Sequence, residues 1–427
     1  MRASEALPPP TSHDEATARM VATVIPSAIL AVLRTLDEAG FHGVVVGGAV
    51  RDALLGRDGG DWDVASNATP EEVIELFPKT IPTGLEHGTV TVLSGRGEDR
   101  HAVELTTFRG EGAYHDGRRP SEVRFLRDLT EDLARRDLTI NALAWDPVNA
   151  VLTDAFGGLE DMRAGLIRAV GEPERRFNED GLRTMRAVRF AATMGFALAP
   201  ETEAAIAGAL EVFAKVSRER VRVELVKLLR APKPSLGLEP MVRTGLWAHV
   251  LLPLDDADQA AAIAAVDRLP PRPMLRLTRL LAPARHGADG RARIEATVEA
   301  LKPSREERAR VLALTHPRVD ALAEALAAED AVAARRCVAA LTRTYLEDAA
   351  DLLELDAAAR DRLGAALEGA ALTGKELAIQ GRDLIQAGVA KPGPALGKLL
   401  AALLDWVLED PARNHREALL DQARSLA

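Results

Sequence analysis

Residues 44–64 read V-V-V-G-G-A-V-R-D-A-L-L-G-R-D-G-G-D-W-D-V, and this stretch is the most informative of the sequence. A β-branched run ends at Gly47-Gly48, and residues 49–55 then have the composition of a helix. A second alternating run, 61–65, follows. A strand, a glycine pair, a helix and another strand in this order predict an α/β unit whose glycine backbone can receive a triphosphate.

The second run carries two acidic residues with strand spacing. On a strand, Asp61 and Asp63 share one face, where their charges repel unless a cation lies between them. Carboxylate ligands of this kind suit Mg²⁺. Glu104, in another alternating run, would add a third carboxylate for in-line displacement at phosphorus. A D-x-D alone is usually a turn or a solvated face, and a G-G alone a turn. Only their combination, with Arg51 one turn into the helix, predicts a nucleotidyltransferase.

Residues 133–143 place two arginines and a carboxylate beside an apolar stretch that we interpret as a helix start. In a functional interpretation, Arg136 holds the nucleotide phosphates or base, and Asp137 contacts the ribose. The alternative is an ordinary helix with a charged surface.

A third segment, residues 179–190, repeats polar residues every three positions. Asp180, Arg183, Arg186 and Arg189 would form one drifting stripe on a helix, which a triphosphate or an RNA backbone would stabilise. The pairing edges of C and A offer an amine beside a ring-nitrogen acceptor, so an Asp acceptor beside an Arg donor selects them against U and G. The alternative is a self-paired, solvated face.

Length, composition and charge limit the number of domains and the classes of function that the sequence allows. A chain of 427 residues with 47% hydrophobic content predicts about two to four domains, and strand signals become scarce after residue 156. The net charge of −10 argues mildly against nucleic acid, but residues 174–233 hold 12 Lys/Arg against 8 Asp/Glu, which permits RNA binding. The single cysteine excludes an intramolecular disulfide framework. No apolar run approaches the ~20 residues of a membrane span, so we expect a cytoplasmic protein without a membrane partner.

Several motifs resemble one family in order and spacing. They are G-G-A-V-R-D at 47–52, D-W-D at 61–63, G-L-E-H-G-T-V at 84–90, E-L-T-T-F-R at 104–109, R-R-D-L-T-I-N-A-L at 135–143, E-D-G-L-R-T-M-R-A-V-R-F at 179–190, E-R-V-R-V-E-L at 219–225 and G-R-D-L-I-Q-A-G-V-A-K-P-G-P-A-L-G at 381–397. The sequence is similar to the class II tRNA nucleotidyltransferases, which are the bacterial CCA-adding enzymes and their poly(A) polymerase relatives.

This resemblance implies an α/β head domain of the DNA polymerase β-like nucleotidyltransferase type, followed by an all-helical extension of neck, body and tail. The expected boundaries are a disordered lead-in at 1–22, the head at 23–155, the neck at 156–232, the body at 233–320 and the tail at 321–427. The implied roles are nucleotide contacts for Gly48, Arg51, Arg136, Arg186 and Arg189, Mg²⁺ binding for Asp61 and Asp63, and a protein template made by Asp180 and Arg183.

The implied reaction is template-independent addition of CCA to the 3′ end of tRNA from CTP and ATP, with release of pyrophosphate. The body and tail would hold the acceptor–TΨC half of tRNA, and residues 110–124 would form the flexible loop that helps the switch from CTP to ATP. Addition of only CC, only A, or poly(A) remains an alternative, and the oligomeric state stays open. A catalytically silent RNA-binding protein is a more distant rival, since all three carboxylates are present.

Overall fold

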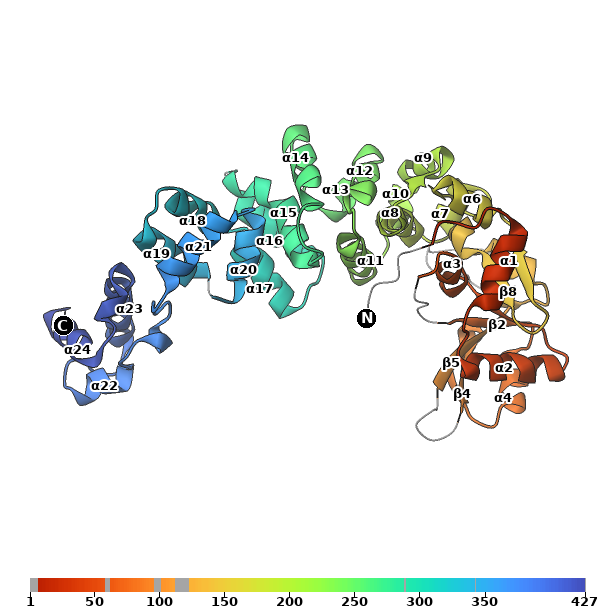
Figure 1. Cartoon of the computed structure of the whole chain (residues 1–427), viewed down its shortest axis with the longest axis horizontal. Helices are drawn as coiled ribbons and strands as arrows, with labels where there is room; N and C mark the ends of the chain where they lie inside the picture. The colour runs from red at the N-terminus through yellow and green to blue at the C-terminus, as the bar shows by residue number, and fades with distance from the viewer. Residues whose placement is uncertain are drawn as a thin grey trace. The chain divides into compact units, whose positions relative to one another are not determined.

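Two compact units make up the protein, residues 1–250 and residues 251–427. The computed structural model describes residues 7–57, 62–95, 101–111, 123–287, 289–341 and 343–426. The first unit holds a sheet and helices, and in the second the described elements are helical (Figure 1). An α/β head followed by a helical extension is therefore confirmed, while the finer division into neck, body and tail stays a prediction.

A seven-stranded sheet forms the centre of the first unit, in the order β3-β4-β5-β2-β1-β8-β9. Every neighbouring pair is antiparallel except β2 and β5, which run parallel. The strands are β1 (Gly43–Val46), β2 (Val64–Ser66), β3 (Thr80–Gly84), β4 (Thr89–Ser94), β5 (His101–Thr107), β8 (Leu143–Asp146) and β9 (Val151–Asp154). Two short two-stranded pairs accompany it, β6 (Arg109–Glu111) with β7 (Val123–Phe125) and β10 (Leu166–Ile167) with β11 (Ala197–Leu198).

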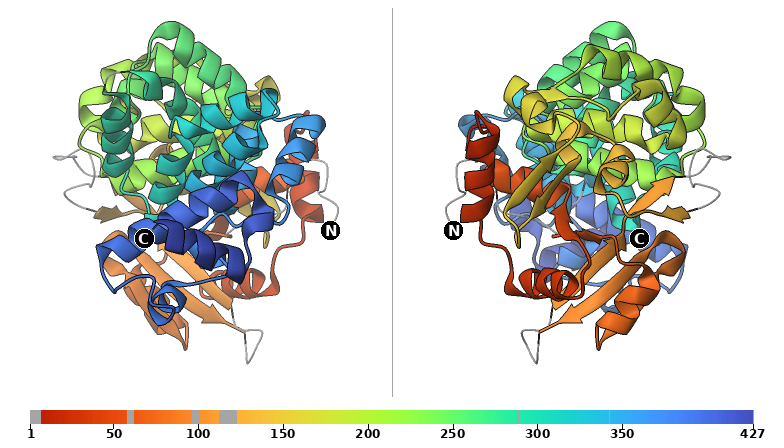
Figure 2. Two further views of the ribbon diagram at one scale, coloured as in Figure 1. Left: turned by 90° about the vertical axis from the view of Figure 1, so that its left-hand side faces the viewer. Right: turned by 90° about the vertical axis from the view of Figure 1, so that its right-hand side faces the viewer.

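The helices of the first unit surround this sheet and continue beyond it. They are α1 (His13–Ala22), α2 (Ser27–Glu38), α3 (Gly48–Leu54), α4 (Pro70–Leu76), α5 (Leu129–Ala134), α6 (Gly158–Ala164), α7 (Pro173–Glu179), α8 (Leu182–Met194), α9 (Pro200–Gly208), α10 (Leu210–Phe213), α11 (Arg218–Arg230), α12 (Ser235–Arg243) and α13 (Leu246–Val250). Both α2 and α4 lie against the strands, as Figure 1 and the right view of Figure 2 show. The arginine-bearing helix α8 packs between α11 and α12, which fixes its orientation.

The N-terminal segment corrects one expectation. We predicted that residues 1–22 are a disordered lead-in, and from residue 7 this is wrong. The Ser12 side chain caps α1 by accepting from an amide of its first turn, and Met20 is buried. Arg19 donates from Nη1 to the carbonyl of Pro8 at 2.6 Å and to that of Leu54 at 2.9 Å. The segment is therefore held against the end of α3, through contacts between distant residues that local composition does not reveal.

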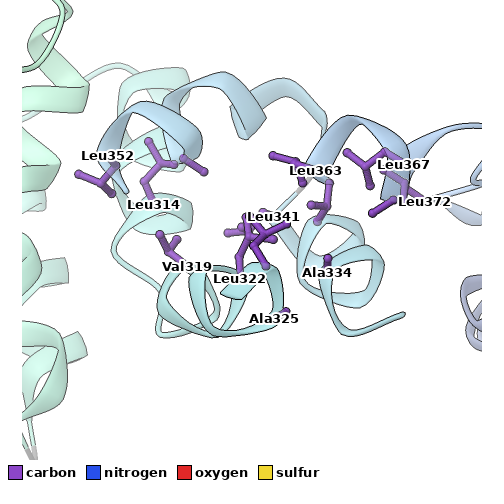
Figure 3. Close-up of a cluster of buried hydrophobic side chains, with 14 of the residues drawn as sticks. Leu314, Val319, Leu322, Ala325, Ala334, Leu341, Leu352, Leu363, Leu367 and Leu372 are labelled. Atoms are coloured by element: carbon purple, nitrogen blue, oxygen red, sulfur yellow. The ribbon is translucent and has the colours of Figure 1, made fainter. Parts of the chain in front are cut away.

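The second unit is built from helices alone in its described part. They are α14 (Asp256–Val266), α15 (Pro273–Leu281), α16 (Gly290–Ala300), α17 (Arg305–Leu314), α18 (Arg318–Ala327), α19 (Ala331–Leu341), α20 (Leu346–Leu352), α21 (Ala357–Leu367), α22 (Gly381–Gln386), α23 (Pro394–Glu409) and α24 (Arg416–Leu426). One hydrophobic core joins most of them and includes Leu314, Leu322, Leu341 and Leu363 (Figure 3). Among the helices of the described residues, none alone is long and apolar enough to cross a membrane, and α1 with α2 reach that length and composition only as a pair bent by 112°.

Candidate active site

Two predicted catalytic carboxylates meet at the start of the parallel strand pair. Val64 of β2 lies opposite Leu105 of β5, so the same register carried back by one residue places Asp63 beside Glu104. Both residues are exposed, and the buried neighbours Val64 and Leu105 point to the other face. Asp61 lies outside the described residues, so its place on this face stays a prediction. Two adjacent exposed carboxylates form a donor set suited to a divalent cation.

The glycine pair forms the predicted strand-to-helix junction. Gly47 has φ +76°, a conformation that favours glycine, and its N–H donates to the carbonyl of Leu143 at 3.0 Å. A Cβ atom on Gly47 would lie 2.8 Å from Nη1 of Arg136. Gly48 then begins α3. The missing side chain thus lets a predicted nucleotide-binding arginine lie directly over the junction.

Arg51 projects from α3 and is only 8% exposed. Its Nε and Nη2 each donate to Asp52 at 2.9 Å, and its Nη1 donates to the side-chain oxygen of Asn141. The guanidinium also lies 5.0 Å from the centre of the Phe190 ring, so α3 and α8 meet at this side chain. Arg51 is therefore positioned by three different elements.

Arg136 follows α5, and the helix start that we predicted within residues 133–143 is wrong. Helix α5 ends at Ala134, a single 3₁₀ turn spans Thr139–Asn141, and β8 begins at Leu143. Asp132, which is fully buried, accepts from Nη2 of Arg136 at 3.4 Å. Burial lowers the pKa of Arg136, and the neighbouring Asp132 charge opposes that change.

Asp137 is committed to partners within the protein. Its Oδ1 accepts from the N–H of Leu138 at 2.9 Å and from Nδ2 of Asn141 at 3.1 Å. Its Oδ2 accepts from Nε of Arg186 at 2.7 Å. Burial would raise the pKa of Asp137, but the charge and hydrogen bond of Arg186 and the bond from Asn141 hold it well below the usual range. Asp137 is therefore ionised at neutral pH and orients Arg186, and its contact with a ribose stays a prediction.

An aromatic ring gathers three of the predicted phosphate-binding arginines. The guanidinium carbons of Arg189, Arg186 and Arg51 lie 3.4, 5.6 and 5.0 Å from the centre of the Phe190 ring. Buried Glu224, on α11, accepts from Nε of Arg189 at 2.8 Å and lies 4.0 Å from Nη1 of Arg186. Like charges that would repel in isolation are held together by this ring and by the Glu224 and Asp137 carboxylates.

Asp180 does not join the helical stripe that we predicted. It has extended backbone between α7 and α8, and α8 begins only at Leu182. A Cβ on the intervening Gly181 would lie 2.6 Å from backbone atoms of Phe213, which explains the glycine at this bend. The Asp180 carboxylate accepts from the N–H of Leu182 at 3.0 Å and from Nη2 of Arg220 at 2.7 Å.

Arg183, the predicted partner of Asp180 in base selection, is directed to other groups. Its Nη1 donates to Glu179 at 2.6 Å and to the carbonyl of Arg176 at 3.1 Å, and its Nη2 donates to the carbonyl of Arg135 at 3.1 Å. The structure thus brings Asp180 and Arg183 to one bend, where they form hydrogen bonds with different partners.

The sequence interpretation assigned no role to several residues that build the site. Five of them lie inside motifs that the sequence interpretation recognised, and their roles could have been sought there. The sixth, Asp132, lies in no recognised motif. These residues are Asp132, Asn141, Glu179, Phe190, Arg220 and Glu224.

The chain matches three family models along its length. These are the poly(A) polymerase head domain at residues 44–168, the RNA- and SrmB-binding region of polymerase A at 195–257, and tRNA nucleotidyltransferase domain 2 at 331–423. The first match covers the sheet and the glycine junction.

Whole-chain relatives carry one common name. The CCA-adding enzyme of Lactiplantibacillus plantarum is 38% identical over 423 residues, which is 96% of this chain and 99% of that protein. The CCA-adding enzyme of Levilactobacillus brevis is 38% identical over 91% of this chain and 95% of its own length. The crystal structure of the Bacillus stearothermophilus CCA-adding enzyme in complex with CTP is similar with a TM-score of 0.71 and 32% identity, covering 95% of this chain and 99% of that one. The chain belongs to the family of CCA-adding enzymes, the tRNA nucleotidyltransferases.

Proposed function

We propose that this protein adds CCA to the 3′ end of tRNA from CTP and ATP, without a nucleic-acid template and with Mg²⁺ as its metal. The observation that carries the proposal is the register of the central strands β2 and β5, which places Asp63 beside Glu104. In the reaction, the 3′ oxygen of tRNA bonds to the α-phosphorus, the bond to the bridging oxygen breaks, and pyrophosphate leaves. A tRNA substrate would place the enzyme in the cytoplasm.

The carboxylates fit a divalent cation by their chemistry. Asp63 and Glu104 are exposed and adjacent, and oxygen ligands of this kind suit Mg²⁺. With Asp61, which the sequence places two residues before Asp63, they would hold Mg²⁺, which stabilises charge on the phosphoryl oxygens when bound. The register of β2 and β5 fixes the spacing of the two carboxylates.

The arginines around Phe190 would bind the triphosphate. Arg51 and Arg186 are held by hydrogen bonds to Asn141 and Asp137, so their positions are set before the substrate arrives. Such preorganised cations stabilise the charge that develops on the leaving pyrophosphate. Base selection by Asp180 and Arg183 is part of the same proposal, and it requires a nucleotide base to take over contacts that Arg220 and Glu179 now make.

The test is incubation of the protein with Mg²⁺, CTP, ATP and a tRNA transcript ending at the discriminator base, followed by sequencing of the 3′ end. A CCA end is expected, and chelation with EDTA should stop addition until Mg²⁺ is restored. CC alone, A alone after a supplied CC, or a long A tail would retain the chemistry but assign a sister activity.

Asp63→Asn is the matching variant, because it removes the charge and keeps the shape. We expect loss of incorporation by about 10³-fold or more, with tRNA affinity within about twofold of the original. Asp37→Asn, which changes an exposed carboxylate at the far end of α2, is the control and should retain full activity. Substantial turnover by Asp63→Asn would contradict the metal assignment.

A further inference from the structure

Glu104 lies between two polar neighbours on one face of the sheet. Strand β5 runs between β2 and β4, so Glu104 has Asp63 on one side and Thr91, its direct cross-strand partner, on the other. The Glu104 side chain is exposed, and within the described part of the chain no residue donates a hydrogen bond to it. Carboxylates that bind metal are usually oriented by hydrogen bonds of their own. Glu104 therefore needs a donor that holds it in one orientation.

Thr91 can supply this donor. Its side chain is buried, and its Oγ1 lies 2.9 Å from Oγ1 of Thr83 on β3. A hydroxyl has one proton and can accept two hydrogen bonds, so when Thr83 donates, the proton of Thr91 is left for another acceptor. The Cβ atoms of directly opposite residues are about 4.5–5.5 Å apart, a separation that a bent glutamate side chain can bridge. The Thr91 proton can therefore reach the Glu104 carboxylate.

An irregularity in β3 brings Thr83 to Thr91. The ladder between β3 and β4 pairs Ile81 with Thr91 and Gly84 with Thr89, so the register shifts between these two pairs. Such shifts redirect a side chain and are common beside active sites. Thr83 lies inside the shifted segment, and its hydroxyl reaches across to Thr91.

The next row of side chains on this face provides an internal comparison. Thr106, two residues after Glu104, lies opposite Thr89, and their Oγ1 atoms are 3.1 Å apart. In that row, two hydroxyls on β4 and β5 form a hydrogen bond with each other. In the row of Glu104, a carboxylate takes the place of the β5 hydroxyl, and Thr91 bonds to Thr83 instead. Thr89 is therefore a matched control for Thr91.

We propose that Thr91 is a positioning residue for Glu104. Its hydroxyl, oriented by Thr83, donates to one oxygen of the Glu104 carboxylate, and the other oxygen is left to face Asp63 and a cation between them. Because β5 lies between β2 and β4, one carboxylate can serve both neighbours. The proposal rests on the proposed function, since it serves the metal site described there, and it gives Thr91 no contact with either substrate.

Thr91→Val tests the proposal, because it removes the hydroxyl and keeps the shape and the strand preference. We expect kcat to fall about tenfold, with KM for CTP and for tRNA within about twofold and the Mg²⁺ concentration for half-maximal rate raised about fivefold. Thr91→Ser, which keeps the hydroxyl, should restore most of kcat. In a Glu104→Gln background, Thr91→Val should cause little further loss, because the group that it positions has already been changed.

Binding of Mn²⁺ alone, measured by electron paramagnetic resonance without substrates, provides a readout that does not depend on turnover. Thr91→Val should weaken this binding about fivefold, whereas Thr89→Val should leave both binding and kcat unchanged. Equal effects of the two valine variants, unchanged Mn²⁺ binding in Thr91→Val, or a full tenfold loss in the Glu104→Gln background would overturn the proposal. If the unmodified protein adds no nucleotide, the proposed function fails, and Mn²⁺ binding still tests the role of Thr91.

Discussion

Nε of Arg186 on α8 donates to Oδ2 of Asp137, beyond the end of α5, over 2.7 Å. This bond joins two segments that are 49 residues apart in the chain. Asp137 is buried and the Arg186 side chain is 33% exposed, so the bond is partly shielded from the solvent that weakens surface ion pairs. A neighbouring bond to Asn141 connects the pair to Arg51 on α3. Two of the predicted nucleotide-binding arginines, Arg51 and Arg186, are thus parts of one hydrogen-bonded assembly.

Asp137→Asn keeps the shape of this side chain and removes its charge. We expect KM for CTP to rise about tenfold and the free energy of unfolding to fall by about 1–3 kcal/mol, because Arg186 loses its main partner. Steady-state kinetics and urea titration measure the two effects. Asp52→Asn, which removes the charge of the half-buried partner of Arg51 on the same helix, provides a comparison. If Asp137→Asn has the same KM for CTP as the original protein, this hydrogen-bonded assembly has no role in nucleotide binding.

Asp137→Asn should also change how the free energy of unfolding depends on pH. The pKa of Asp137 is lowered in the folded protein, so its stabilising contribution is complete above the usual Asp value of about 3.9 and is lost as pH falls further. The difference in unfolding free energy between the original protein and Asp137→Asn should therefore stay constant from about pH 8 to pH 5 and shrink below about pH 4. A difference that grows on acidification would contradict the ionised state.

The two adjacent glycines should respond differently to alanine. Gly47→Ala forces an unfavourable φ and displaces Arg136, so we expect a loss of about 1–3 kcal/mol in stability and weaker nucleotide binding. In Gly48→Ala the new Cβ would lie 3.5 Å from Nη2 of Arg51, an ordinary contact, and stability should change by less than about 1 kcal/mol. Thermal unfolding of both variants measures this contrast, and equal losses would refute it.

Arg220 should influence which base is accepted. It holds the Asp180 carboxylate at 2.7 Å, so Arg220→Ala leaves the predicted template acceptor without its orienting partner. We expect the preference for CTP over UTP to fall about tenfold. Arg230→Ala removes an equal charge from the exposed end of α11 and serves as the control. Competition between CTP and UTP is the measurement, and unchanged selectivity would exclude a role for Arg220.

Arg19 should matter for stability rather than chemistry. Its two bonds to backbone carbonyls hold the segment before α1 against the end of α3. Arg19→Ala should lower the free energy of unfolding by about 1–2 kcal/mol with kinetic constants within about twofold. Arg34→Ala, at an exposed position of α2, is the matched control. A large change in kcat without a change in stability would contradict this assignment.

The sequence predicted those features that depend on local pattern. The alternating run around Glu104 falls on β5, and the glycine pair marked the junction before α3. The spacing of Asp61 and Asp63 predicts a shared face because strands have a fixed period of two, and the register of β2 with β5 places Glu104 beside Asp63. These elements are set by neighbours in the chain.

Features that depend on distant contacts were not predictable in this way. The residues after Ala134 have a helical composition, but the buried bonds of Asp132 and Asp137 turn the chain toward β8 instead. Asp180 follows a helical spacing, yet the close approach of Gly181 to Phe213 keeps it outside α8. In both places, tertiary packing overrides a propensity of a few tenths of a kilocalorie per residue.

Arg183 joins the bend before α8 to the ends of two other helices, because it donates to the carbonyls of Arg176 on α7 and Arg135 after α5. A base that takes over one of these donors would release the segment whose carbonyl accepted from it, and that segment would then be easier to move. Thermodynamic linkage makes this effect reciprocal: any ligand that fixes those segments also changes the affinity for the base. Under the proposed base selection by Arg183, discrimination between bases would be distributed over these three backbone segments, and a tRNA that restrains one of them would also adjust which nucleotide is accepted next.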